Sequence, residues 1–458
     1  MSEQLPTLLT NYRLRPLPQS LGFRTLSIML LGLLMLIPLF IAAKIVKERG
    51  LYYQEIRHEI AESWGKKQTL TGPVLVVPYV EHFTNVDTVT DENGESRVVS
   101  KDIYNDRTAI LLPEALEIRT DITEEHNQRG MYDALVYSAN ISLTGKFNHA
   151  NVLKSNEGER RILWDKAFIA IGLDDPRAID TASNFFWNDG RISLEPGTNL
   201  NKLLPAGFHI PLSVNADSNP SNEFKLTLSL RGSDGLYFAP LGENTKILMT
   251  SAWTHPSFHG ELQPDTNAVS EEGFHAEWEV PHLVRSYPQY WVMEDSVDKA
   301  YDLHEITAGV SLDEPAPLYS RIARAIKYGV LCVTLTFVAF LAFEISLKRR
   351  LHVLHYGVVG VALSLFYLIL LALAEHIGFF YAYIAAASTV VLSITIYIGT
   401  ILRHARSTVG LFLLLTSLYG LLYLLLEREN YALLVGVGLL VLAMSIMMFV
   451  TQHLKQTD

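Results

Sequence analysis

Two histidines four residues apart are the first candidates for chemistry in this chain. They occupy positions 255 and 259 of the stretch AWTHPSFHG. A shared metal needs nitrogen ligands at about 2.0–2.1 Å, whereas two residues four apart along a strand are separated by roughly 13 Å. A helix would bring them together, but Pro256 disfavours helical geometry at His255. A tight turn with a third ligand, such as His275, would be required, and the spacing does not indicate one.

The serine in the same stretch is a weak candidate for a nucleophile. Ser257 lacks a Gly-x-Ser-x-Gly elbow and an identified base. We therefore interpret the stretch as a structural turn, in which Trp253 and Phe258 are packed and His255 is hydrogen-bonded. On this interpretation His255→Ala impairs folding or stability, whereas His259→Leu is nearly silent.

Three ionisable residues near the ends of apolar stretches are the second group of candidates. Glu375 and His376 follow one such stretch, and Glu344 lies near the end of another. Ionisable groups at membrane depth are functional candidates by default. The simpler interpretations are interfacial water for Glu375 and His376, and an i,i+4 pair with Lys348 or snorkelling for Glu344. A relay or ligand contact by Glu375 and His376 remains the alternative.

These residues belong to a chain with six stretches long and apolar enough to cross a bilayer as helices. The stretches are residues 26–43, 328–347, 353–374, 379–402, 409–426 and 431–450. The first resembles a signal peptide, but its apolar core is long and Ile41 occupies position −3 of a cut after Ala43, so we expect an uncleaved anchor. The stretches contain no run of acids, no pair of Gly/Pro-broken helices and no arginine ladder, which weakens a pump, transporter or voltage-sensor interpretation.

Lysine and arginine in the short loops predict the orientation of these helices. Residues 348–350 read KRR, Arg403 and Arg406 follow the fourth stretch, and Lys455 lies beyond the sixth. Because cytoplasmic loops are enriched in Lys and Arg, both termini are expected in the cytoplasm. The basic residues at 44–49 favour the opposite orientation for the first stretch, but long domains translocate largely regardless of charge.

The long segment between the first two stretches is acidic. Residues 44–320 carry a net charge of −18 and the remainder carries +7, within a total of −11. This segment would repel nucleic acid and anionic headgroups, so we expect no nucleic-acid partner. Cys332 is the single cysteine, which excludes an intrachain disulfide. No P-loop, dinucleotide fingerprint or HExxH motif is present, and no cofactor or metal is expected.

Short runs rich in Val, Ile, Thr and aromatic residues dominate the acidic segment after a helical start that ends near Gly65. Turn sequences such as DENGES, EPGTN and ADSNPSN separate these runs, a pattern typical of an all-β sandwich. The predicted fold is a membrane protein with six transmembrane α-helices and a large, sandwich-like all-β periplasmic domain between helices 1 and 2. The predicted parts are a cytoplasmic segment (1–25), transmembrane helix 1 (26–43), the periplasmic domain (44–320) and a five-helix transmembrane bundle with a cytoplasmic C-terminus (321–458).

Six sequence stretches resemble the CreD family of bacterial inner-membrane proteins across nearly the whole chain. They are LTGPVLVVPY (70–79), EPGTNL (195–200), HIPL (209–212), WTHPSFHG (253–260), KYGVLCVTLTFVAFLAFE (327–344) and LHVLHYGVVGVALSLFYLILLALAEHIGF (351–379). The family pattern around the histidines is Trp-x-His-Pro-Ser-Phe-x-Gly. It is matched by Trp253, His255, Pro256, Ser257, Phe258 and Gly260. His259 falls on a variable position, which argues against a site built from both histidines.

The resemblance implies an inner-membrane protein of a Gram-negative envelope, in a family linked with envelope integrity and a carbon-source-responsive two-component system. It implies no known reaction and no catalytic residue. The leading hypothesis is therefore a non-enzymatic binding, sensing or scaffolding component whose partners are the bilayer and envelope proteins or cell-wall components. One alternative is an envelope glycan- or lipid-acting enzyme with carboxylates such as Asp174, Asp175 and Glu195. The other is a transporter component that uses Glu375 and His376.

Overall fold

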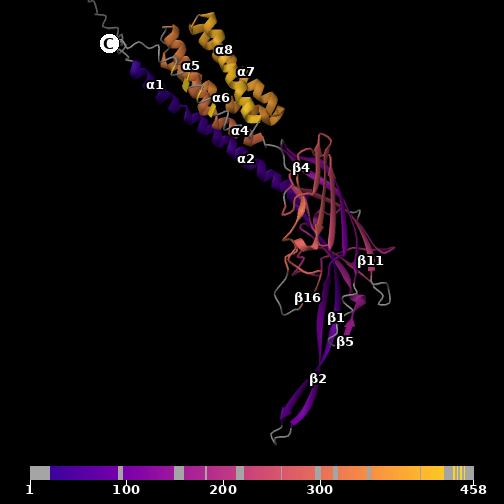
Figure 1. Ribbon diagram of the computed structural model, residues 1–458. Helices are drawn as coiled ribbons and strands as arrows, with labels where there is room; N and C mark the ends of the chain where they lie inside the picture. Colours follow the sequence, from indigo (N-terminus) through magenta and orange to yellow (C-terminus); the bar gives the residue numbers. More distant parts are fainter. Residues whose placement is uncertain are drawn as a thin grey trace, which may run out of the picture. The chain divides into compact units, whose positions relative to one another are not determined.

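Helices and strands occupy different parts of the chain in the computed structural model (Figure 1). The structure describes residues 21–90, 96–130, 132–148, 159–180, 183–212, 221–258, 260–293, 301–312, 318–347, 352–402 and 404–427, and a few helical residues between 437 and 448. The chain divides into a helical unit, Met1–Tyr53 with Ala316–Asp458, and a β-rich unit, Gln54–Pro315.

The helices coincide with the apolar stretches of the sequence. They are α1 (Leu21–Leu34), α2 (Leu36–Trp64), α4 (Leu318–Lys327), α5 (Gly329–Leu347), α6 (Val353–Ile377), α7 (Phe379–Leu402) and α8 (Ala405–Glu427). Five stretches of the described chain are long and apolar enough to cross a membrane: Leu26–Trp64, Leu318–Leu341, Val353–Ile377, Phe379–Ile401 and Ala405–Glu427. The sixth predicted stretch, 431–450, lies largely outside the described residues.

Small and aromatic residues hold the helical unit together. A Cβ added to Gly360 of α6 would come within 2.6 Å of the Met35 sulfur, so the glycine allows close approach of the two segments. The ring of Phe366, also on α6, is 5.4 Å from the ring of Tyr383 on α7 and 4.7 Å from that of Tyr419 on α8. Edge-to-face aromatic contacts of this kind add to the packing between helices.

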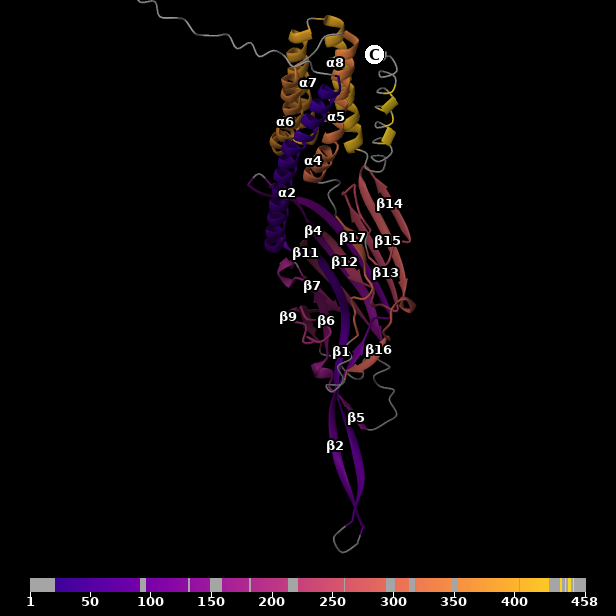
Figure 2. The same ribbon diagram turned by 90° about the vertical axis from the view of Figure 1, so that its left-hand side faces the viewer.

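The β-rich unit consists of two sheets (Figure 2). Sheet A has the order β16 (Tyr290–Met293), β2 (Ser96–Leu111), β1 (Gln68–Thr90), β6 (Phe168–Leu173), β10 (Gly207–Pro211) and β9 (Glu195–Pro196), with β5 (Glu159–Ile162) and β12 (Gly235–Ala239) paired to β1 and β17 (Ala308–Ser311) paired to β12. Sheet B has the order β14 (Thr266–Ser270), β15 (Gly273–Pro281), β13 (Asn244–Ser251), β3 (Ala115–Arg129), β4 (Tyr132–Asn148), β11 (Ser221–Ser233), β7 (Asn184–Trp187) and β8 (Gly190–Ile192). The prediction of a large β-rich domain is confirmed.

One hydrophobic core joins the inner faces of the two sheets. On β3 the residues alternate, so that Leu116, Ile118 and Ile122 are buried while Arg119 is exposed. The period of two along a strand sends alternate side chains to opposite faces of the sheet. The inner face of sheet B is therefore apolar, and its outer face carries the polar half of the same pattern.

Helix α2 continues from an apolar sequence into the polar start of the β-rich unit. It runs unbroken from Leu36 to Trp64. Gly65 follows with φ +148°, and an added Cβ would lie 2.7 Å from the Arg231 carbonyl oxygen. Only glycine fits this close approach with positive φ, and the helix ends there as the sequence predicts.

Candidate functional site

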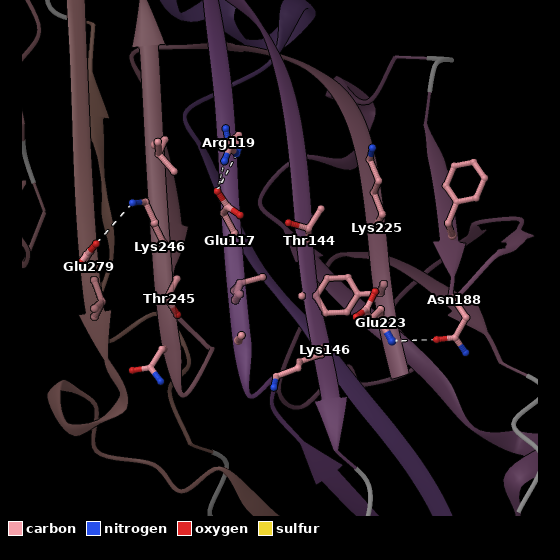
Figure 3. Close-up of a pocket in the computed structure, with 18 of the residues that line it drawn as sticks. Glu117, Arg119, Thr144, Lys146, Asn188, Glu223, Lys225, Thr245, Lys246 and Glu279 are labelled. Atoms are coloured by element: carbon pink, nitrogen blue, oxygen red, sulfur yellow. Dashed lines mark hydrogen bonds and ion pairs between the residues drawn. The ribbon is translucent and has the colours of Figure 1, made fainter. Parts of the chain in front are cut away.

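A hollow on the outer face of sheet B has a volume of about 1390 Å³. Residues from β15, β13, β3, β4, β11 and β7 line it. Figure 3 shows labelled side chains from these neighbouring strands standing on one face of the sheet. Six strands spaced about 4.8 Å apart span roughly 24 Å. The hollow is therefore wide and shallow rather than a closed small-molecule cavity.

Strand register aligns polar side chains in a row across this hollow. The row reads Glu279, Lys246, Glu117, Thr144 and Lys225, each directly opposite the next on the adjacent strand. Residues directly opposite each other on one face have Cβ atoms about 4.5–5.5 Å apart. Charges of opposite sign thus meet on neighbouring strands, although Glu117 and Lys246 come from distant parts of the chain.

Several charges in the hollow neutralise one another. Lys246 forms ion pairs with Glu277 and, at 3.6 Å, with Glu279, and the hydrogen bond with Glu277 raises the pKa of Lys246. Arg119 donates a hydrogen bond of 2.8 Å from Nε to Glu117. The charges of these residues pair with one another on one side of the hollow, so they offer little net charge to a ligand.

The other side of the hollow presents three charged side chains, Lys225, Glu223 and Asp189, with no ion pair to any described residue. Lys225 and Glu223 are exposed and two residues apart on β11, so they share the outer face. Asn188 fixes this edge, because its side-chain oxygen accepts a 3.0 Å hydrogen bond from the Glu223 backbone N–H. Its own backbone N–H donates to the Glu223 carbonyl at 2.8 Å. One cation, Lys225, and two anions, Glu223 and Asp189, are thus available to polar groups of both signs.

The stretch AWTHPSFHG lies in a loop directly after β13. Phe258 packs against Phe274 and Trp278, with ring centroids 5.8 Å and 6.0 Å away, and Trp253 also contacts the core. His255 is exposed, and its Nδ1 lies 2.8 Å from the Thr254 hydroxyl. These contacts fit the structural interpretation of the stretch.

The rest of the stretch is a close-packed turn without a described metal cluster. Gly260 has φ +152°, and an added Cβ would lie 2.8 Å from the Thr307 carbonyl oxygen. Pro256 and Ser257 are partly buried. The described residues contain no group of three His, Cys, Asp or Glu that could hold a metal, and His259 lies outside them.

His209 joins two of the stretches on which the family resemblance rests. His209 belongs to the stretch HIPL, and Gly197 and Asn199 belong to EPGTNL. The His209 Nδ1 lies 2.6 Å from the Gly197 carbonyl oxygen, and its Nε2 lies 3.0 Å from Asn199 Nδ2. A carbonyl only accepts, so Nδ1–H donates to it and Nε2 accepts from the amide. Glu195 lies 3.4 Å from Nε2. The two stretches therefore form one contact that stabilises the end of sheet A.

The carboxylates of the enzyme hypothesis are held by different partners. Arg177 donates to both oxygens of Asp175 at 2.9 Å, and this side-chain contact lowers the pKa of Asp175. A lowered pKa makes a carboxyl group a poor general acid near neutral pH. Glu195 lies beside His209 instead, 3.4 Å from its Nε2, and no described contact joins Asp175 and Glu195 in one site.

The three ionisable residues of the apolar stretches are placed separately. Glu344 is buried in the helical unit and accepts a hydrogen bond of 3.1 Å from the Tyr356 hydroxyl. Lys348, its predicted partner, lies outside the described residues. Glu375 accepts a 2.9 Å hydrogen bond from the Tyr319 hydroxyl of α4, whereas His376 is exposed. Glu375 and His376 therefore do not share a described partner.

The hollow on sheet B contains none of the residues that the sequence singled out. The sequence pattern that corresponds to the hollow is the alternation of charged and apolar residues in 115–121 and 223–228. Any half-exposed strand has the same alternation, so the pattern does not identify a site. Strand register, which determines the meeting of Lys246 with Glu117, could not be read from that alternation.

The fold and these sites define a multi-pass membrane protein with a large β-rich domain. A sequence model described as "Inner membrane protein CreD" matches residues 20–456. The chain is also 32% identical over 424 residues to the inner membrane protein CreD of Escherichia coli (strain K12), covering 92% of this chain and 90% of that relative. The chain belongs to the CreD family, as its sequence motifs indicate, and is an inner-membrane protein.

Similarity to solved structures is weak. The M1 zinc metallopeptidase of Deinococcus radiodurans matches with a TM-score of 0.21 and 9% sequence identity, over 44% of this chain and 42% of that chain. A single-residue mutant of the same enzyme matches with a TM-score of 0.20. Likeness at this level carries no argument about fold or activity.

Proposed function

We propose that this protein is a non-enzymatic envelope component whose β-rich domain lies in the periplasm and binds an extended, polar cell-wall polymer on the outer face of sheet B. Six transmembrane helices, with the β-rich domain inserted between the first two and both termini in the cytoplasm, hold it in the inner membrane. Binding at this surface supports envelope integrity by anchoring or sensing the polymer. The observation that carries the proposal is the wide hollow with its exposed pair Lys225 and Glu223.

The shape of the hollow favours a polymer over a small molecule. Small-molecule sites are mostly apolar cavities of about 300–1,000 Å³, whereas this hollow is larger, open and crossed by rows of charged side chains. Cores of protein–protein interfaces are depleted in charged residues and enriched in aromatic ones. A hydrated polymer with amide, hydroxyl and carboxylate groups fits the charged floor better than an apolar protein surface does.

Co-sedimentation of purified full-length protein with isolated peptidoglycan sacculi tests the proposal. The informative variant is Glu223→Lys combined with Lys225→Glu, which exchanges the two charges and keeps the net charge of the domain. We expect this exchange to raise the apparent Kd, measured by titrating the sacculi, by about tenfold, which corresponds to the loss of about 1.4 kcal/mol of polar contacts.

A matched control separates a local effect from a general electrostatic one. Exchanging charges at Lys101 and Asp102 on β2 of sheet A, as Lys101→Asp with Asp102→Lys, also keeps the net charge, and it should leave sedimentation unchanged. Equal sedimentation of wild type and the β11 exchange variant would remove sheet B as the binding face. Failure of the wild type to sediment would remove the cell-wall polymer as the ligand.

A further inference from the structure

The helical unit contains an apolar groove between α2 and the α4–α5 segment. Its volume is about 810 Å³. The helices touch at both ends of the groove: an added Cβ on Gly50 would lie 3.4 Å from Tyr319, and one on Gly329 would lie 2.9 Å from Leu39. Between these contacts the lining includes the small residue Ala323, so the two segments leave space between them.

The lining of the groove is largely apolar and contains two lysines. Leu36, Ile37 and Phe40 line the apolar part. Lys47 on α2 and Lys327 at the end of α4 also line the groove, and both are exposed. Neither lysine forms an ion pair with a described residue, and the lining includes no carboxylate. Long lysine stems can lie along apolar surface while the ammonium group reaches the interface.

The length of the groove matches one leaflet of a bilayer. Its lining on α2 runs from Leu36 to Gly50, about 21 Å at 1.5 Å per residue. Half of the hydrocarbon core is about 15 Å thick, so the groove covers one acyl-chain layer and reaches the headgroup region. A helix that crosses the membrane would need about 30 Å, which this groove does not provide.

We propose that this groove is a binding site for one anionic phospholipid, with an acyl chain against the apolar lining and the phosphate between Lys47 and Lys327. Van der Waals packing of the acyl chain against the apolar lining positions the lipid, because its chain is already in an apolar environment within the bilayer. The two lysines supply preference for a negative headgroup, because two cations with no ion pair to a described residue, in a lining that itself holds no carboxylate, complement a phosphate diester whose net charge is negative. The site is independent of the polymer-binding face on sheet B.

Native mass spectrometry of the full-length protein tests this site with two lipids of identical acyl chains, phosphatidylglycerol and phosphatidylcholine. We expect the wild type to retain phosphatidylglycerol preferentially. The double variant Lys47→Gln with Lys327→Gln should reduce that preference by about thirty-fold. Each lysine near a lipid surface contributes about 1 kcal/mol, or about five-fold, and the two factors multiply. Lys44→Gln is the matched control, because Lys44 lies outside the groove and pairs with Glu48 at 3.8 Å.

A second variant addresses the groove itself. Ala323→Phe fills it and should lower retention of both lipids equally, while thermal unfolding verifies that the variant is folded. Excess inorganic phosphate should not displace the lipid, because a free anion does not pack against the apolar lining. An unchanged preference for phosphatidylglycerol in the double lysine variant would overturn the proposal. Unchanged lipid retention in Ala323→Phe would also overturn it, because the lipid would then bind outside this groove.

Discussion

Ser257 and Ser311 exchange two backbone hydrogen bonds, of 3.0 Å from the Ser257 N–H and 2.8 Å from the Ser311 N–H. This pairing fastens the AWTHPSFHG loop to β17, the last described strand of the β-rich unit. The bonds use only backbone atoms, so they do not depend on the serine hydroxyl. The side chain that anchors the loop is the neighbouring Phe258, which packs between Phe274 and Trp278.

The first prediction concerns this loop. Phe258→Ala should lower the free energy of unfolding by about 2–3 kcal/mol, somewhat less than the 3–5 kcal/mol typical of fully buried phenylalanines, because Phe258 is half-buried. His255→Ala should change it by no more than about 0.5 kcal/mol, because the ring is exposed. Chemical unfolding of the full-length protein, followed by tryptophan fluorescence, measures both. The sequence interpretation placed stability on His255, so a larger loss in His255→Ala than in Phe258→Ala would restore it.

The second prediction concerns the contact between EPGTNL and HIPL. His209→Ala leaves the Gly197 carbonyl and the Asn199 amide without their ring partner, at a cost of about 2–3 kcal/mol in unfolding free energy. Glu195→Gln should cost less than about 1 kcal/mol, because the Glu195 side chain is 54% exposed. The same unfolding measurement applies, with His275→Ala as the control, because His275 is an exposed residue of β15. Equal stability of His209→Ala and His275→Ala would show that the contact is unimportant.

The third prediction is a pH dependence at Asp175. Arg177 lowers the pKa of this carboxyl in the folded protein, so its stabilisation is present above the unfolded value of about 3.9 and is lost as pH falls through the folded value. Asp175→Asn should therefore lower the Tm at pH 7, with a cost below about 1 kcal/mol because Arg177 is largely exposed. The difference from wild type should vanish at acidic pH.

Asp165→Asn provides the control for this pH dependence, since Asp165 is exposed. Asparagine at position 175 can still accept the backbone hydrogen bond from Arg177, but it removes both the charge and the acceptor for Arg177 Nη2. A Tm difference that persists unchanged below pH 3 would attribute the effect to packing instead of ionisation.

The fourth prediction tests orientation in the membrane. Cys332, the single cysteine, is buried and can be replaced by serine to give a background for labelling. In that background, Val98→Cys on the exposed part of β2 should react with a membrane-impermeant maleimide in intact spheroplasts. Arg406→Cys, at the start of α8, should react only after permeabilisation. The reverse labelling pattern would place the β-rich domain in the cytoplasm.

The sequence predicted the elements of this fold better than their partners. Apolar stretches predicted the described helices because burial in lipid demands continuous apolar surface. Gly65 predicted the end of α2, because the backbone there has a positive φ that glycine adopts readily. The sixth stretch, 431–450, remains a prediction, because most of it lies outside the described residues.

Contacts between distant residues could not be predicted in the same way. The approach of His209 to Gly197 depends on the pairing of β9 with β10, and the meeting of Lys246 with Glu117 depends on the parallel register of β13 and β3. One-residue shifts in register exchange the two faces of a strand. Alternation within a single strand therefore predicts a face, but it does not predict the neighbours on that face.

The long β1–β2 pair has a consequence for how far the domain can reach. Beyond His82, β1 pairs only with β2 in the described chain, from Phe83 opposite Ile103 to Thr90 opposite Ser96 (Figures 1 and 2). Eight residues at about 3.3 Å each extend this arm by roughly 26 Å. A two-stranded ribbon is marginally stable alone, so the arm depends on its root, where Glu81 binds Arg160. Shortening the arm would reduce the radius within which the domain meets its surroundings while leaving the sandwich core whole.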